Sequence, residues 1–151
     1  MIFSIKIEKL IYINWEKNEF NFLSLRTFQS YRLRMKIDLS YLREMSGGNQ
    51  SLIIEMIDIF KDQVKEFAEG LETHYEKKEF EQLGKLAHKA KSSISIMGLN
   101  DLATDLKTLE LLAKAGKDQD KYQQIIDKFK FETLEAVDEL NEVTKNLELY
   151  F

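Results

Sequence analysis

The chain has 151 residues, of which 44% are hydrophobic and 32% are charged, a balance that suits one compact domain with a sizeable core. The absence of cysteine excludes disulfides and thiolate metal sites, and the absence of proline with only six glycines favours long helices over turn-rich sheets. A net charge of −4 argues against nucleic acid as a partner, and without a long apolar run or a secretory signal we expect a cytoplasmic protein with no membrane partner.

The first segment, residues 1–34, differs in pattern from everything that follows it. It contains six Lys or Arg and three Glu, so it carries +3 while the remainder of the chain carries −7. Its isoleucines partly alternate, as a strand would require, at Ile5, Ile7, Ile11 and Ile13. Two interpretations stay open: the natural protein begins at Met35, or these residues form an aromatic-rich arm that packs on the domain or on a partner. We therefore treat residues 1–34 as an N-terminal extension and residues 35–151 as the domain.

A short helix is expected from Ile37 to Met45, because Asp38 or Ser40 can serve as its N-cap and Ser46-Gly47-Gly48 ends it. The side that we expect to be buried holds Leu39, Leu42 and Met45. This short helix is expected to lie across the longer helices and to cover one end of the core.

A long second helix is expected from Asn49, which can cap it, to about Tyr75. Its apolar residues recur at steps of three and four and form one core stripe, which comprises Ile53, Met56, Ile57, Phe60, Val64, Phe67 and Leu71. Leu52 and Ile59 lie off this stripe. They either contact the short first helix or form an exposed patch near a docking surface.

The third helix is expected from Glu79 to Met97, and Gly98 follows it as a residue in the left-handed conformation. Its apolar residues Leu83, Leu86, Ala87, Ala90, Ile94 and Met97 form one stripe. The fourth helix is expected from Asp101 to Ala115, with Asn100 or Asp101 as its cap and Gly116 as its end. Its inward residues are Leu102, Ala103, Leu106, Leu109 and Ala113.

The last helix is expected to open at Asp118 or Asp120 and to run to about Asn146. Its inward residues are Tyr122, Ile125, Ile126, Phe129, Thr133, Leu134, Val137 and Leu140. Four long amphipathic helices joined by short loops indicate an all-α fold. Because short connections make successive helices antiparallel, the specific prediction is an antiparallel up-and-down four-helix bundle with a short extra N-terminal helix.

His88 lies outside the apolar stripe of the third helix. Residues three and four apart share a helix surface, so its neighbours are Gly84, Lys85, Lys91 and Ser92, with Ser95 two turns on. The imidazole is therefore expected to stand exposed among small residues and two lysines. An exposed imidazole is largely neutral at the pH of the cytosol, so a ring nitrogen can act as a nucleophile, and Lys91 can hold an anion attached to the ring.

This spacing resembles the motif of histidine-containing phosphotransfer (HPt) domains. In that motif Lys follows the histidine at the third position, as Lys91 does, Gly usually follows at the fourth, and Gly stands again at the tenth, as Gly98 does. The fourth position here is Ser92, whose hydroxymethyl group either crowds a partner or hydrogen-bonds a phosphoryl oxygen. The resemblance covers most of residues 36–147.

The resemblance implies a relay of phosphoryl groups between receiver domains, one of a hybrid histidine kinase and one of a response regulator. It implies that His88 is the phosphorylated nucleophile, through Nε2, and that Lys91 stabilises the phosphoryl group. The receivers would dock on the face that holds Gly84, Lys85, Ser92, Ser95 and Ile96. The partner receiver would supply Mg²⁺, while this chain would bind no cofactor and act as a monomer.

Other chemistries have weaker support in the sequence. There is no glycine-rich loop that would cradle the phosphates of ATP, so we expect no kinase activity of the chain's own. Neither histidine follows a glutamate by three residues, so no metal site of the bundle type is expected. His74, among acidic neighbours, and the Glu- and Lys-rich helix faces are interpreted as solvated surface.

The main alternative function is a non-catalytic helical module that binds a receiver domain or a partner helix on the same face. Replacing Lys91 by alanine separates the two, because it slows transfer in a relay protein and has no turnover to slow in a binding module. A stand-alone enzyme is a third interpretation, for which the sequence offers no second catalytic group.

Overall fold

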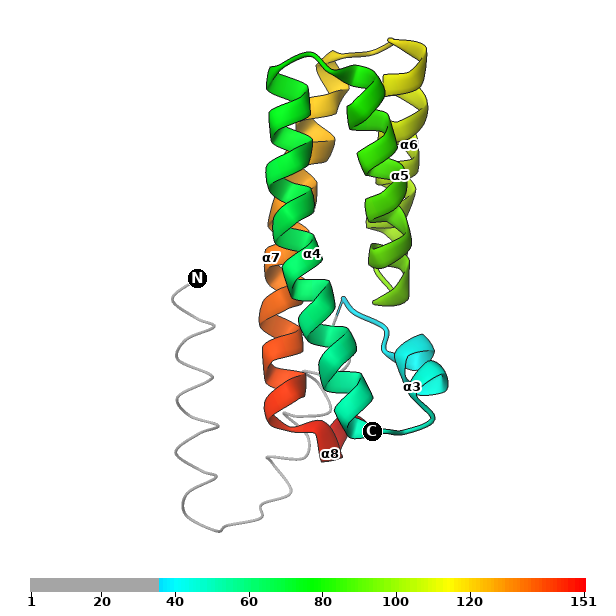
Figure 1. The fold of residues 1–151 in the computed structure, drawn as a ribbon, viewed down its shortest axis with the longest axis vertical. Helices are drawn as coiled ribbons and strands as arrows, with labels where there is room; N and C mark the ends of the chain where they lie inside the picture. The colour runs from blue at the N-terminus through cyan, green and yellow to red at the C-terminus, as the bar shows by residue number, and fades with distance from the viewer. Residues whose placement is uncertain (1–35) are drawn as a thin grey trace. The chain divides into compact units, whose positions relative to one another are not determined.

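The computed structural model describes residues 36–151, in which the regular structure is helical throughout (Figure 1). The helices are α3 (Ser40–Ser46), α4 (Gln50–Glu76), α5 (Phe80–Ile96), α6 (Asn100–Ala115), α7 (Asp120–Lys145) and α8 (Leu147–Tyr150). No strand is present in these residues, so the all-α prediction is confirmed for them. The predictions made for residues 1–34 lie outside the described part of the chain.

Four of the described helices are long and lie side by side, with the short α3 near one end (Figure 1). Both α4 and α6 pack against α5 and against α7. The contacts between α4 and α5 show that these two helices run in opposite directions, because Gln63 bonds Ser93 while Gly70 meets Leu86. Helices α6 and α7 are also antiparallel, since Tyr122 bonds Leu112 while Lys128 pairs with Asp105.

The apolar stripes predicted for the long helices form most of the core. On α4 every residue of the predicted stripe is buried except Met56, which is half-buried. On α7 the prediction for Leu134 is wrong, since its side chain is 64% exposed. The prediction for Thr133 is confirmed, since its side chain is 1% exposed and its hydroxyl donates to the carbonyl of Phe129 at 2.6 Å. That hydrogen bond satisfies the buried hydroxyl, so a threonine can occupy the core.

Helix α3 is shorter than expected, and its buried side differs from the prediction. Leu42 is fully buried, whereas Met45 is 57% exposed, so the prediction that Met45 points inward is wrong. Ser46 is buried instead, and its hydroxyl donates to the carbonyl of Arg43. A helix this short does not let periodicity fix which residues face the core.

The helix ends show which cap predictions hold. Asn49 accepts a hydrogen bond from the backbone N–H of Leu52, which confirms it as the cap of α4. The N-cap of α6 is Leu99, not Asn100 or Asp101, and the N-cap of α7 is Gln119, not Asp118 or Asp120; neither makes a side-chain capping bond.

Gly98 ends α5 and joins that end to the start of the described chain. Its φ is +74°, and the N–H groups of Gly98 and Leu99 donate to the carbonyls of Ser95 and Ile94, as in a Schellman motif. The N–H of Asp38 donates to the carbonyl of Met97, and a Cβ placed on Gly98 would lie 2.4 Å from Asp38 Cβ. The prediction of a left-handed Gly98 is therefore confirmed, and this close contact anchors α5 where it ends.

Candidate functional site

His88 lies near the middle of α5, and its side chain is 58% exposed. The core side of α5 is formed by other residues, which include Leu83, Ala87, Ala90 and Ile94. The ring therefore reaches solvent from a helix that is held by its packing against α4 and α6. A second protein can approach an imidazole in this position.

Glu110, on α6, faces the ring from the neighbouring helix. Its Oε2 lies 3.1 Å from Nδ1 of His88, and its side chain is only 3% exposed. A carboxylate oxygen only accepts hydrogen bonds, so this contact favours a proton on Nδ1. In the neutral imidazole, a proton on Nδ1 leaves the lone pair on Nε2. The site thus combines a buried carboxylate with an exposed imidazole, whose Nε2 can act as a nucleophile in this tautomer.

Two lysines of α6 hold Glu110 in its ionised form. Lys114 Nζ donates to Glu110 Oε1 at 2.6 Å, and Lys107 Nζ donates to Oε2 at 3.2 Å. The Lys114 hydrogen bond is the main reason that the pKa of Glu110 is lowered to about 2, with smaller contributions from His88 and Lys107, although burial opposes the shift. A buried carboxylate needs such partners, because an unpaired charge is costly to bury.

Glu110 is a site residue that the sequence prediction misses. The prediction includes it among the charged helix faces interpreted as solvated surface, and the structure shows that interpretation to be wrong for this residue. A signal is present, because Glu110 follows Leu106 by four residues and precedes Ala113 by three, which places it on the inward stripe of α6. A glutamate at an inward position requires partners that can pair with its charge.

Lys91 follows His88 by three residues, so the two share one surface of α5. Lys91 is half-buried, and within residues 36–151 its ammonium has no ion-pair partner in the structure. Lys85, the other lysine of this face, differs, because its Nζ lies 2.7 Å from Glu81 in an exposed pair. Of the two predicted lysines, Lys91 is therefore the one whose charge is available to an anion.

Gly84 does not lie where the sequence prediction placed it. It is buried against α6, and a Cβ there would lie 3.3 Å from the carbonyl oxygen of Glu110 and 3.4 Å from Cγ of Lys114. The expectation that Gly84 belongs to the docking face is therefore corrected. The absence of a side chain at Gly84 instead lets α6 approach α5 beside the histidine.

The other predicted docking residues lie on or beside the exposed face of α5. Ser92 and Ser95 are exposed, and Ile96 is half-buried. The hydroxyl of Ser95 donates to the carbonyl of Lys91 at 2.9 Å, so it is used within its own helix. The hydroxyl of Ser92 makes no hydrogen bond within residues 36–151.

His74 is partly exposed and is paired with Glu79, which is exposed. Its Nδ1 lies 2.7 Å from Oε2 of Glu79, and its side chain is 30% exposed. The pairing resembles that of His88, but Glu79 is itself 45% exposed, whereas Glu110 is buried. His74 is therefore a useful internal comparison for experiments on His88.

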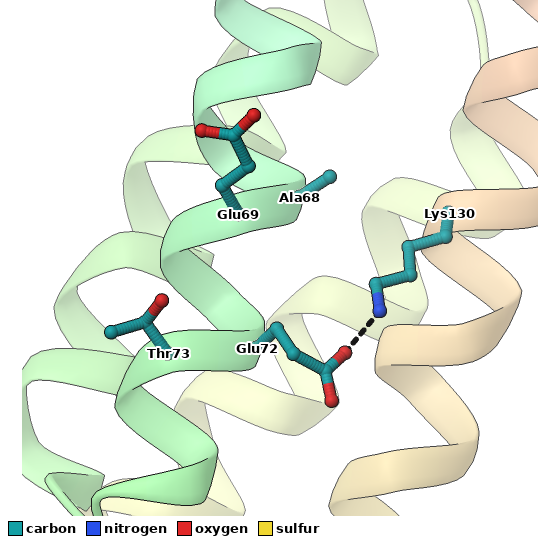
Figure 2. Close-up of a pocket in the computed structure, with 5 residues that line it drawn as sticks. All are labelled: Ala68, Glu69, Glu72, Thr73 and Lys130. Atoms are coloured by element: carbon teal, nitrogen blue, oxygen red, sulfur yellow. Dashed lines mark hydrogen bonds and ion pairs between the residues drawn. The ribbon is translucent and has the colours of Figure 1, made fainter.

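A pocket between α4 and α7 is a second candidate site. It is lined by Ala68, Glu69, Glu72, Thr73 and Lys130. Figure 2 shows Glu72 reaching across to Lys130, with which it forms an ion pair, while Glu69 points away. The charges of that pair neutralise each other, and the pocket holds no nucleophile comparable to the imidazole of His88.

Two further findings concern the described residues as a whole. No three His, Cys, Asp or Glu side chains of residues 36–151 are grouped so that they could hold a metal ion. None of the helices in this part of the chain combines the length and the apolar character that crossing a membrane requires.

Comparison with known proteins gives one match. A family model described as "Hpt domain" matches residues 55–147, which is more than half of the chain and includes His88, Lys91 and Glu110. Neither the comparison with curated proteins nor the comparison with solved structures finds a match.

Proposed function

The chain belongs to the Hpt domain family, and we propose that it relays a phosphoryl group between receiver domains through Nε2 of His88. Membership of this family implies histidine phosphotransfer in phosphorelay signalling. The observation that carries the assignment to His88 is its geometry: an exposed ring whose Nδ1 lies 3.1 Å from a buried carboxylate. His74 lacks the buried carboxylate and lies outside the motif.

In the proposed reaction the lone pair of Nε2 attacks the phosphorus of an aspartyl phosphate on the donor receiver. The N–P bond forms while the P–O bond to the aspartyl carboxylate breaks, and the aspartate leaves as a carboxylate. Positive charge develops on the imidazole during the attack, and Glu110 stabilises it because its carboxylate faces Nδ1. Transfer to a second receiver reverses these bond changes.

Lys91 is the second residue that we assign to the reaction. Its position one turn from His88 suits an ammonium that attracts the oxygens of the transferring group. Mg²⁺ held by the partner receiver supplies further charge neutralisation. This chain then contributes a positioned nucleophile, and much of the catalytic power comes from the receiver.

We propose that the receivers dock over α5 and the adjoining face of α4. From α5 this surface includes Lys85, Ser92, Ser95 and Ile96. On α4 the side chains of Leu52 and Ile59 are 37% and 50% exposed. Because Gln63 bonds Ser93 and the two helices are antiparallel, Ile59 lies level with the end of α5, near Ile96. Exposed apolar side chains beside a reactive group are typical of a transient protein interface.

The proposed frame for this site is an antiparallel up-and-down four-helix bundle of α4 to α7, with α3 as the short additional helix. The opposite directions of α4 and α5, and of α6 and α7, support this arrangement. We propose that the protein acts in the cytoplasm and as a monomer. A monomer leaves the histidine face uncovered, as each receiver needs in turn.

The test is transfer from a panel of receiver domains, each phosphorylated beforehand and supplied with Mg²⁺. The native protein is expected to accept label from at least one of them, His88→Gln from none, and His74→Gln as well as the native protein does. Retained acceptance by His88→Gln would contradict the proposal. Binding of receivers without any transfer would support the non-catalytic module instead.

A further inference from the structure

Lys114 and His88 bind opposite oxygens of the same carboxylate. Lys114 Nζ donates to Oε1 of Glu110 at 2.6 Å, whereas the ring faces Oε2 at 3.1 Å. The second ammonium, of Lys107, shares Oε2 with the ring. Because Lys114 fixes the oxygen that the ring does not use, it sets the rotation of the carboxylate and keeps Oε2 directed at Nδ1.

The Lys114 side chain passes close to the glycine in α5. A Cβ on Gly84 would lie 3.4 Å from Cγ of Lys114, so the lysine stem crosses α5 close to Gly84. Gly84 precedes His88 by four residues and therefore lies one turn from it. The structure thus leaves room for Lys114 to reach Glu110 from beside the histidine.

The charge of Glu110 has two opposed effects on the ring. It orients Nδ1–H, but a bare carboxylate beside an imidazole also favours the doubly protonated imidazolium, which has no lone pair and cannot attack phosphorus. Among residues 36–151, Glu110 is the one ion-pair partner of the ring; Lys85 and Lys91 lie one turn away on α5, and α4 contributes no such partner. The ammonium on Glu110 therefore offsets the charge that would protonate the ring.

We propose that Lys114 is a positioning residue that acts through Glu110 to keep His88 in the neutral, Nδ1-protonated form with Nε2 free. This inference rests on the proposed role of His88 as the phosphoryl acceptor. It assigns to Lys114 a function in the reaction that is exerted through its contact with Glu110.

A phosphoramidate donor tests the inference without any receiver. In that reaction Nε2 attacks phosphorus, the P–N bond of phosphoramidate breaks, and ammonia leaves with a proton from solvent. The rate of His88 phosphorylation is measured from about pH 5.5 to about pH 9 for the native protein, Lys114→Met and Lys114→Arg. Lys117→Met is the matched control, because it removes one positive charge just beyond the end of α6, and no ion pair to Lys117 exists in the described residues.

Lys114→Met is expected to move the acidic limb of the rate profile up by about half to one pH unit. At about pH 6 phosphorylation then slows by about three- to tenfold, whereas at about pH 9 the difference shrinks because the ring is neutral in both proteins. Lys114→Arg is expected to restore most of the native profile, since a guanidinium can still donate to Oε1. Lys117→Met is expected to follow the native profile.

Imidazole nitrogen chemical shifts, measured by NMR over the same pH range, give a readout that a purely structural role would not move. The ring of Lys114→Met is expected to take up its second proton at higher pH than the native ring does. If Lys114→Met fails to fold, Lys107→Met serves instead. It is expected to shift the rate profile in the same direction by less, because the hydrogen bond from Lys107 to Glu110 is longer, at 3.2 Å.

Two results would overturn the inference: superimposable profiles of Lys114→Met and the native protein, or an equal shift in Lys117→Met. Failure of the relay proposal would give a different result from failure of this inference. In that case phosphoramidate labels His88 and the Lys114 effect is present, but no phosphorylated receiver transfers to the native protein.

Discussion

Replacing Glu110 by glutamine isolates the charge of this buried group from its shape. The glutamine side chain keeps the size of the glutamate and one acceptor oxygen, which can face either Lys114 or His88, but it removes the negative charge. In the folded protein the pKa of Glu110 is lowered from 4.5 to about 2, chiefly by the hydrogen bond from Lys114. Its folded value therefore lies below the unfolded one, so the charge adds stability above about pH 4.5, and this stability is lost as the pH falls toward 2.

The size of this contribution follows from the same shift. The difference between 4.5 and about 2 corresponds to roughly 3.5 kcal/mol at most, at about 1.4 kcal/mol for each pH unit. The ammonium groups of Lys107 and Lys114 are on side chains that are 45% and 52% exposed, so solvent screens the pairing. We therefore expect the charge of Glu110 to contribute about 1–2 kcal/mol to the free energy of unfolding near pH 7.

Urea denaturation of the native protein and of Glu110→Gln between about pH 2 and about pH 7 measures the contribution of this charge to the free energy of unfolding. The variant is expected to be less stable by about 1–2 kcal/mol near pH 7, and the two curves are expected to converge as Glu110 becomes protonated near pH 2. The control is Glu81→Gln, because Glu81 pairs with Lys85 on the surface and is 77% exposed. A difference between Glu110→Gln and the native protein that did not change with pH would refute the reasoning.

Three further outcomes are expected. His88→Gln should end phosphoryl acceptance while circular dichroism and urea denaturation stay native, since its ring is exposed, and His74→Gln should keep acceptance. Lys91→Ala should slow transfer from a phosphorylated receiver by about tenfold, in single-turnover kinetics, because one ammonium is lost from the partly solvated site. Gly98→Ala should lower the free energy of unfolding by about 1–3 kcal/mol, because φ is +74° and the new Cβ would meet Asp38 at 2.4 Å; unchanged urea stability would contradict this.

Helix positions are predictable because the apolar period of each long segment is clear. The stripe of α4 and the glycines that end α5 and α6 are local signals, and the structure confirms them. The prediction places both Thr133 and Leu134 inward, and it is wrong for Leu134 because adjacent residues of a helix point in different directions. Thr133 occupies the inward position, as its hydroxyl bonds the carbonyl of Phe129 within the same helix.

Only the part of the site that lies on a single helix is predictable from the sequence. Exposure of His88 and the position of Lys91 follow from the three- and four-residue spacing of α5. Glu110 comes from the next helix, 22 residues later, so its contact with the ring depends on how α5 and α6 pack. The prediction for Gly84 fails for the same reason: its missing side chain makes room for α6, which spacing along α5 alone does not reveal.

The most direct test of the account is to locate the phosphoryl group after transfer from a phosphorylated receiver in the presence of Mg²⁺. Mass analysis of the intact protein and its peptides, with an acid-lability test, identifies the residue, and phosphorus–nitrogen NMR couplings identify the ring nitrogen. The account predicts a single acid-labile phosphoryl group on Nε2 of His88, opposite the Nδ1 that faces Glu110. A phosphoryl group on Nδ1 of His88, on His74 or on any other residue would contradict it.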